Sequence, residues 1–277
     1  MGTKTWTGSG DGTTFMSAGN WSGGLPQNDD TLIINTGSDA IAGAATGLTG
    51  ITLRVTTNFT GTIGSSTTYL DMNGPNCIFE SGGPEAYLTG EWTNMRITGG
   101  APTSDFLSLK GSSDTVIGTL ISSGLRGTIT INSSATVTTI FATGERSGTI
   151  DIKNGVTNTS ISVANGVVLT ASSATTIEVL DGDLTVSGTA AVTTLEIDGG
   201  GTVNYLSSGT IGTLTVFDGI FDAQDNDSTT FTITNSTVHK SGVLGLDSSF
   251  NNVVLTNPCS MLGGEFRAPI GSTISLT

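Results

Sequence analysis

Three Asp-Gly pairs come nearest to a catalytic or metal-binding pattern in this chain. They are Asp181-Gly182, Asp198-Gly199 and Asp218-Gly219, with Asp183, Asp222, Asp225 and Asp227 close to them in sequence. Carboxylates on neighbouring coils can do acid-base chemistry on polysaccharides or hold calcium. The alternative is that Asp and Asn precede Gly because both tolerate left-handed turn conformations. Asn154-Gly155 and Asn165-Gly166 show the same pattern without charge, so we predict turns, with no catalytic and no metal-binding residues.

The other reactive side chains are too few for the common catalytic or metal sites. His239 is the single histidine, which excludes a multi-histidine metal site and a Cys-His zinc site. No Gly-x-Ser-x-Gly elbow accompanies it, so a Ser-His-Asp triad is not predicted, and His239 is expected at a surface or ladder position. Cys77 and Cys259 stand at opposite ends of a repeat array, and we predict two buried thiols beyond disulfide reach. We therefore predict a protein that is not an enzyme and takes no cofactor.

Aromatic and terminal residues outside the regular repeats are the remaining candidates for binding. Tyr87, Trp92 and Phe106 lie in or beside an irregular segment, where they either pack internally or form a patch for a sugar or a protein. Aromatic side chains are enriched at protein interfaces, and the last residues could provide an edge strand for another subunit. The predicted interface candidates are Trp6, Trp21, Trp92, Pro102, Ile274 and Leu276.

A recurring apolar pattern defines the elements that must position these residues. One predicted apolar column contains Leu120, Ile140, Ile161, Ile177, Leu195, Leu214, Ile233 and Leu255. In a second column, Gly127, Gly148, Gly166, Gly182, Gly201, Gly219, Gly242 and Gly264 each stand two residues before Ile129, Ile150, Val168, Leu184, Val203, Phe221, Leu244 and Phe266. A period of roughly twenty residues with two strand segments indicates a solenoid. We predict an all-β parallel β-helix whose strands alternate apolar residues inward and Thr or Asp outward.

The pattern divides the chain into three segments. Residues 1–35 are predicted to form an N-terminal cap, because two tryptophans in a Gly-rich stretch can cover the exposed end and strand edges of a first coil. Residues 36–110 are predicted to be irregular first coils with a protruding loop, because proline cannot join a central ladder. Residues 111–277 are predicted to be the regular β-helix.

Composition excludes several classes of partner. The formal net charge is −14, and the nine Lys and Arg residues form no basic patch, so nucleic acid is not a predicted partner. No stretch of about 18 apolar residues is present, so no membrane span is predicted. The start of the chain has neither an apolar h-region nor a small-residue cleavage site, from which we expect synthesis in a host cytoplasm without export by the general route.

The opening segment resembles a known group of proteins. Trp6, Asp11-Gly12, Phe15, Ala18, Asn20-Trp21, Gly24, Pro26, Asp30-Thr31 and Ile33 are similar to the start of many bacterial and bacteriophage right-handed parallel β-helix proteins. In that group the segment precedes the β-helices of autotransporter-type adhesins and of phage structural proteins. Autotransporter relatives would carry a signal peptide and a membrane barrel, so the resemblance implies the virion branch.

These observations lead to one expected function and two alternatives. We expect a structural virion protein that decorates or stabilises a capsid, or forms a fibre-like projection, as a homotrimer located in the virion. Its expected partners are further copies of itself, a major capsid or other virion protein, and a host-surface glycan. The alternatives are a receptor- or glycan-binding adhesin or tail spike, and a β-helix polysaccharide lyase or hydrolase.

Overall fold

The computed structural model describes residues 1–80, 85–99, 105–144, 148–223, 226, 230–239, 241–246 and 253–267, with the side chain of Asp105 outside this description. The described residues contain no α-helix, and stacked parallel coils form a β-solenoid of about 10 turns, ~21 residues apart. This confirms the predicted all-β parallel solenoid. The described residues also include no helix that is long and apolar enough to cross a membrane.

The chain divides into two compact units. The first is Met1–Ile140 with Ser147–Asp151, and the second is Phe141–Arg146 with Ile152–Thr277. The first unit contains β1 (Thr3–Trp6), the 3-10 helix η1 (Ala18–Asn20), β2 (Trp21–Ser22), β3 (Thr31–Ile34), β4 (Thr52–Val55), β5 (Leu70–Asp71), β6 (Gly74–Phe79), β7 (Ala86–Thr89), β8 (Glu91–Gly99), β9 (Asp105–Leu109), β10 (Val116–Leu125) and β11 (Thr128–Ile131).

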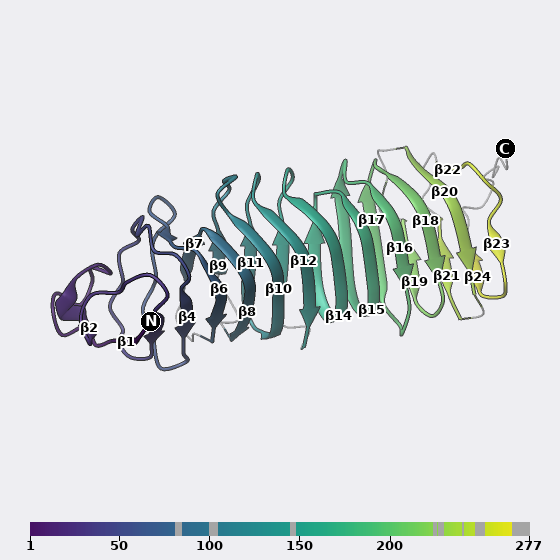
Figure 1. Ribbon diagram of the computed structural model, residues 1–277. Coiled ribbons are helices and arrows are strands. Elements are labelled where there is room, and N and C mark those ends of the chain that lie inside the picture. Colours follow the sequence, from purple (N-terminus) through teal and green to yellow (C-terminus); the bar gives the residue numbers. More distant parts are fainter. Residues whose placement is uncertain are drawn as a thin grey trace. The chain divides into compact units, whose positions relative to one another are not determined.

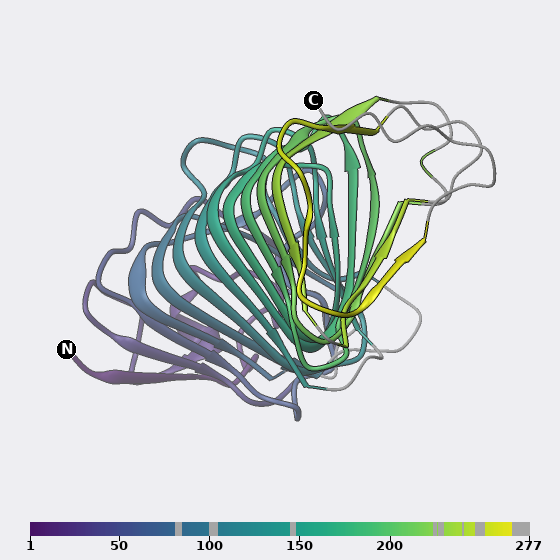
Figure 2. The same cartoon turned by 90° about the vertical axis from the view of Figure 1, so that its right-hand side faces the viewer.

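The division falls within β12 (Thr136–Thr143) and β13 (Thr149–Ile152). The second unit contains β14 (Thr157–Thr170), β15 (Ala174–Gly188), β16 (Val192–Ile197), β17 (Thr202–Ser207), β18 (Thr210–Val216), β19 (Ile220–Asp222), β20 (Phe231–Val238), β21 (Val243–Gly245), β22 (Val253–Leu255), β23 (Ser260–Met261) and β24 (Glu265–Arg267). Figure 1 labels most of these strands, and Figure 2 shows those of the second unit lying over one another along successive coils.

The predicted glycine-led column is an inward ladder in the second unit. Parallel pairing places Val168, Leu184, Val203, Phe221, Leu244 and Phe266 in register on six successive coils. The first five are buried and Phe266, in the last described strand, is half-buried. Asp183 and Thr185 flank Leu184 and face outward, as period-two alternation requires. The other predicted column, which begins at Leu120, holds from Ile161 through Ile177 and Leu195 to Leu214.

The column that begins at Leu120 was predicted wrongly at the step after Leu214. Leu214 pairs with Ser236, whereas Ile233 pairs with Ile211, three positions earlier in β18. The coil between Leu214 and Ser236 is three residues longer than the coil between Leu195 and Leu214, so a constant spacing selected the wrong inward residue. Ser236 is 5% exposed, and its hydroxyl has no hydrogen-bond partner among the described residues. The inward position that Leu214 occupies on one coil is therefore occupied on the next coil by a serine whose hydroxyl has no hydrogen-bond partner among the described residues.

The first unit is more regular than its prolines suggested. Leu32, Leu53, Cys77, Met95 and Leu120 pair in register as one inward column. Within residues 36–110, where irregular first coils and a protruding loop are predicted, the described residues include β6, β7 and β8. Pro75 lies inside β6, but the register skips from Gly74 to Asn76, so the missing N–H removes no ladder partner. Pro84 and Pro102 lie outside the described residues.

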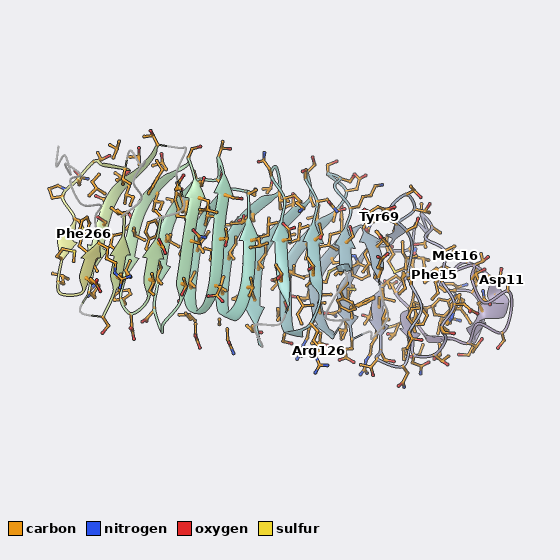
Figure 3. All side chains as sticks on the ribbon, turned by 180° about the vertical axis from the view of Figure 1, so that it is seen from behind. Asp11, Phe15, Met16, Tyr69, Arg126 and Phe266 are labelled. Atoms are coloured by element: carbon orange, nitrogen blue, oxygen red, sulfur yellow. The ribbon has the colours of Figure 1, made fainter. Side chains whose placement is uncertain are left out.

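The N-terminal segment covers the first strands with an aromatic cluster. β1 pairs with β2 antiparallel and with β3 parallel, so the first strand has a partner on each side. Trp6, Phe15 and Trp21 are each at most 4% exposed, and the centroid of the Trp21 ring lies 5.2 Å from that of Trp6 and 5.1 Å from that of Phe15. Figure 3 labels Phe15 of this cluster, and Asp11 of the loop beside it. Trp6, Phe15 and Trp21 of the opening motif therefore form one buried aromatic cluster.

Asn20 connects the loop that folds over these rings. Its side-chain oxygen Oδ1 accepts hydrogen bonds from the backbone amides of Gly10 and Gly12 at 2.9 and 3.0 Å. Its amide nitrogen donates to Asp11 Oδ1 at 2.7 Å and to the carbonyl oxygen of Thr14 at 2.9 Å. Asn20 is fully buried, so one side chain satisfies four polar groups of the loop.

Glycine is required in the turns for two different physical reasons, left-handed backbone at some positions and close approach between coils at others. Left-handed backbone, which we predicted for the Asp-Gly and Asn-Gly turns, occurs at Asn165, Gly155 and Gly199. Gly182 and Gly219 do not have positive φ in the described structure. A Cβ at Gly219 would lie 2.5 Å from the carbonyl oxygen of Gly201 on the preceding coil. The left-handed conformation predicted for the residue before Gly is therefore absent at Asp181 and Asp218, and Gly182 and Gly219 are required by close approach between coils.

We expect Gly219→Asn to destabilise the protein more than Gly200→Asn. Gly200 has a φ of +85°, a Cβ added there would meet no atom within 4 Å, and Asn tolerates the left-handed region. At Gly219 the new Cβ would meet both Gly201 and Ile197 Cγ2, and such overpacking costs about 1–3 kcal/mol. Urea unfolding of both variants measures the difference. Equal losses of stability would contradict the close-approach explanation.

Candidate functional site

The Asp-Gly carboxylates do not form a row across three coils. The register places Gly182, Gly201 and Gly219 at equivalent positions, which aligns Asp181 and Asp218 with Gly200 rather than with Asp198. Asp198 instead follows Ile197, which pairs with Val179 and Val216. The middle turn contains one extra glycine, which moves its aspartate out of line. The prediction of equivalent positions was therefore wrong at Asp198, and two of the carboxylates lie two coils apart.

The remaining titratable side chains are also dispersed. No group of three or more His, Cys, Asp or Glu side chains that could hold a metal ion occurs among the described residues. His239 follows β20, and its ring stacks on Phe217 with centroids 4.4 Å apart, as expected for a ladder position. Both cysteines are free thiols; Cys77 is buried and Cys259 is half-buried, so the prediction of two buried thiols holds for one. Burial raises the pKa of the Cys77 thiol to about 12, which keeps it protonated and unreactive.

The predicted tryptophan contacts are buried inside the chain. Trp6, Trp21 and Trp92 are 2%, 4% and 2% exposed, so their rings offer almost no surface to a partner. Pro102, Ile274 and Leu276 lie outside the described residues, as does most of the chain end proposed as an edge. Phe106 is also buried, with its ring centroid 5.3 Å from that of Phe79. Of the three aromatic residues considered as a patch, only Tyr87 reaches the surface.

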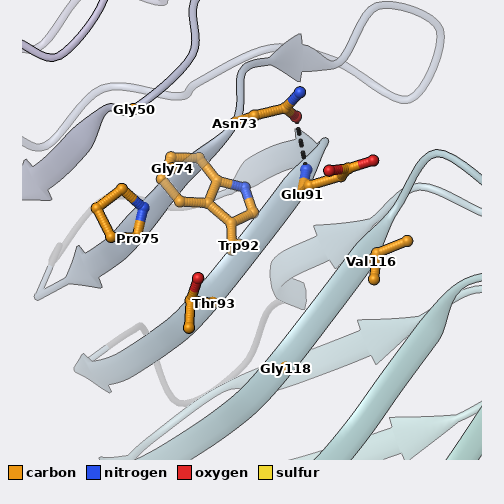
Figure 4. A pocket seen from close by; sticks show the side chains of 9 residues that line it. All are labelled: Gly50, Asn73, Gly74, Pro75, Glu91, Trp92, Thr93, Val116 and Gly118. Carbon is orange, nitrogen blue, oxygen red and sulfur yellow. Dashed lines mark hydrogen bonds between the residues drawn. The ribbon is translucent and has the colours of Figure 1, made fainter.

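A shallow groove of about 550 Å³ lies beside Trp92. Figure 4 shows the Trp92 ring next to Gly74 and Pro75, with Glu91 donating its backbone N–H to Asn73 Oδ1 at 2.7 Å. The indole Nε1 has no hydrogen-bond partner among the described residues, but it is buried. Much of the remaining lining consists of Gly50, Gly74 and Gly118, which carry no side chain. The groove therefore offers few groups that could recognise a ligand.

A second groove, of about 290 Å³, brings side chains of several coils together, and we call it the tyrosine groove. Its lining residues are Ser66, Tyr69, Glu85, Ala86, Tyr87, Ser108, Thr130 and Asn132. They come from β7, β9 and β11 and from the segments flanking β5, β7 and β11. Tyr87 pairs with Ser108, and Ser108 with Thr130, so these three outward side chains stack on consecutive coils.

The two tyrosines are positioned by the strands behind them and by one glycine. Leu70 and Leu88 pair in register and are buried, which places Tyr69 and Tyr87 next to each other on the outer face. Their ring centroids are 5.6 Å apart, with an interplanar angle of 89°. Gly64 has a φ of +70°, and a Cβ there would lie 3.1 Å from Tyr87 Cβ, so a glycine lets the turn before Tyr69 approach Tyr87.

Hydrogen bonds and one cation fix the polar groups of the tyrosine groove. The Tyr87 hydroxyl donates to Glu85 Oε2 at 2.9 Å, and the Tyr69 and Ser108 hydroxyls lie 3.4 Å apart. Asn132 Nδ2 donates to Ser108 Oγ at 3.0 Å and to the carbonyl oxygen of Leu109 at 2.8 Å. Lys110 Nζ lies 6.0 Å from the centroid of the Tyr69 ring. The rings and the amide are therefore held in place before any ligand arrives.

Sequence reasoning found Tyr87 but missed its partner Tyr69. A usable signal was the Tyr-Leu dipeptide, which occurs at Tyr69-Leu70 and again one coil later at Tyr87-Leu88. The same dipeptide at Tyr205-Leu206 has the opposite orientation, because Tyr205 is fully buried and donates to the carbonyl oxygen of Gly209 at 2.8 Å. The dipeptide alone therefore does not say which residue faces outward.

Comparison of the chain with protein-family models, with curated proteins and with solved structures finds no match.

Proposed function

We propose that this protein is a non-enzymatic structural protein of a bacteriophage virion, which decorates or stabilises a capsid or forms a fibre-like projection. The observation that carries the proposal is the continuous glycine-led apolar column of the second unit. The five residues from Val168 to Leu244 in its glycine-led column are buried, and each pairs with the next coil. A parallel solenoid with such ladders satisfies its backbone groups through neighbouring coils, which suits a stiff and durable element.

The distribution of acidic side chains supports a role without catalysis. Acid-base chemistry needs two carboxylates that face one substrate at a defined separation. Asp181 and Asp218 instead occupy equivalent positions on coils that are not adjacent, and Asp198, on the coil between them, occupies a different turn position. The similarity of the opening segment to phage and bacterial β-helix proteins supports the virion setting.

Two measurements test this function. We expect sedimentation equilibrium to give three times the chain mass of 28.0 kDa, as in a homotrimeric virion component. We also expect no cleavage of capsular or pectic polysaccharides, with or without added calcium. A monomer that cleaves such a polysaccharide, and that loses this activity on Asp198→Ala or Asp218→Ala, would overturn the proposal. The coding neighbourhood is an independent check, with a position beside capsid or tail genes expected.

A further inference from the structure

We propose that the tyrosine groove binds an uncharged saccharide ring. The groove combines two aromatic side chains at right angles with hydroxyl, amide and carboxylate groups in a hollow of about 290 Å³. That volume is at the lower end of small-molecule sites, roughly 300 Å³ and above, so it suits one sugar ring with its neighbours outside. The inference is independent of the virion role, because the groove lies within one chain.

The aromatic rings provide the apolar part of the site. Tyr69 and Tyr87 are half-buried, so each ring is supported from behind by the sheet and keeps part of its surface open. The face of an aromatic ring carries negative charge density, which attracts the weakly positive C–H groups on one side of a pyranose. Neighbouring strands are roughly 4.8 Å apart, which is close to the size of one sugar ring per coil.

The polar groups match a ligand with many hydroxyl donors. Glu85 provides a carboxylate at the edge of the Tyr87 ring, where its Oε2 already accepts a hydrogen bond from the Tyr87 hydroxyl. The Asn132 amide is held by its two donated hydrogen bonds, and its Oδ1 accepts none among the described residues. These acceptors can bind sugar hydroxyl protons, while the Ser66 and Thr130 hydroxyls can donate or accept.

The charges at the groove select against ionic ligands. A carboxylated or sulfated sugar would be repelled by Glu85 and by the net charge of −14. A quaternary ammonium ligand is the other ligand that paired tyrosines could bind. Here, however, the Lys110 ammonium already lies over the Tyr69 ring, and a second cation would be repelled by it. Because Glu85 and Lys110 carry opposite charges, an ionic ligand of either sign meets one repelling group, whereas an uncharged saccharide meets none.

Saturation-transfer NMR with the full chain tests the proposal. The probes are glucose, galactose, mannose and N-acetylglucosamine, with maltose, cellobiose, lactose and chitobiose, each titrated to about 20 mM, above the millimolar range expected for single rings. N-acetylneuraminic acid, glucuronic acid and tetramethylammonium are the ionic comparisons. We expect at least one uncharged sugar to saturate the protein, and to bind more tightly than all three ionic probes.

The variants assign this binding to the groove. Tyr87→Ala should weaken it by roughly tenfold, the value of a lost aromatic contact. Tyr69→Phe keeps the ring and should lose less than Tyr69→Ala, and Glu85→Gln checks the polar side if Tyr87→Ala fails to fold. Phe217→Ala, which removes a half-buried outward ring from the other unit, is the matched control and should bind normally.

Three results would overturn the inference. They are no binding of any uncharged sugar in the panel, tighter binding of an ionic probe, or sugar binding that Tyr69→Ala, Tyr87→Ala and Glu85→Gln all leave unchanged. A monomeric protein that binds sugar in the groove, and that cleaves a polysaccharide in a way lost on Asp198→Ala or Asp218→Ala, would refute the virion role alone. A trimer that neither cleaves nor binds sugar would refute the groove alone.

Discussion

The variant Asn20→Asp is expected to unfold the N-terminal cap at neutral pH. The substitution removes the Nδ2 donor that reaches Asp11 Oδ1 at 2.7 Å and the carbonyl oxygen of Thr14 at 2.9 Å. It also places a second carboxylate against Asp11, at a fully buried position. An uncompensated buried charge costs about 3–5 kcal/mol, and the two lost hydrogen bonds add to this cost. The measurement is urea unfolding followed by the fluorescence of Trp6 and Trp21, with hydrogen exchange in β1 and β3.

The pH dependence gives this prediction a second readout. The pKa of Asp11 lies well below its ordinary value of 3.8, because the Thr14 side chain, the Thr14 backbone amide, the Asn20 side chain and the Thr13 backbone amide donate hydrogen bonds to the carboxylate. Since the folded-state pKa is lowered, this stabilisation of the natural chain is complete above pH 3.8 and is lost as the pH falls below it. In the variant, acid also protonates one of the two carboxylates at positions 11 and 20, which removes the repulsion between them. The difference in stability between the two chains should therefore narrow as the pH falls.

A matched control separates the cap network from the chemical change itself. Asn94 is exposed in β8 of the same unit. Among the described residues its amide donates only to Pro75 O at 3.4 Å and to Asn76 Oδ1 at 3.5 Å. Asn94→Asp should change stability by about 0.5 kcal/mol or less. If Asn20→Asp were equally mild, or if its penalty grew toward acid pH, the assignment of Asn20 as the connecting residue of the cap would be wrong.

The inward columns could be predicted because a few consecutive residues are enough to show which side chains of a strand are apolar and therefore buried. Leu184 between Asp183 and Thr185 already indicates which side chain faces the lumen, and the glycine two residues earlier marks the turn. Where the coil length changes, this local information does not fix the register. Ser236 is the example, because its coil is three residues longer than the preceding one, so that Ser236 and not Ile233 pairs with Leu214. One extra glycine had the same effect on Asp198.

The candidate site was less predictable because it depends on register between distant segments. Tyr69 and Tyr87 become neighbours only when Leu70 pairs with Leu88, and Ser108 joins them from the next coil. Exposure was a further difficulty, since three tryptophans that suggested contacts to other subunits are all buried. An aromatic residue in a solenoid faces inward or outward according to a single step of register, and its identity alone does not decide between them.

The variant Phe221→Ala is expected to be among the most destabilising single changes in the second unit. Phe221 is fully buried, pairs with Val203 and Leu244 in the inward column, and lies with its ring centroid 5.7 Å from that of Tyr205 and 6.5 Å from that of Phe231. Truncating a buried Phe to Ala costs about 3–5 kcal/mol, from lost burial and from the cavity that remains.

Phe217→Ala makes the same chemical change four residues earlier, where the ring is half-buried on the outer face and contacts His239. Because less apolar surface is lost and no internal cavity forms, we expect a cost of about 1 kcal/mol. Since each coil packs only on its neighbours, hydrogen-exchange protection in Phe221→Ala should fall first in β17, β19 and β21 and persist longer in β14. Equal losses of stability in the two variants would mean that the inward and outward faces of this coil are assigned the wrong way round.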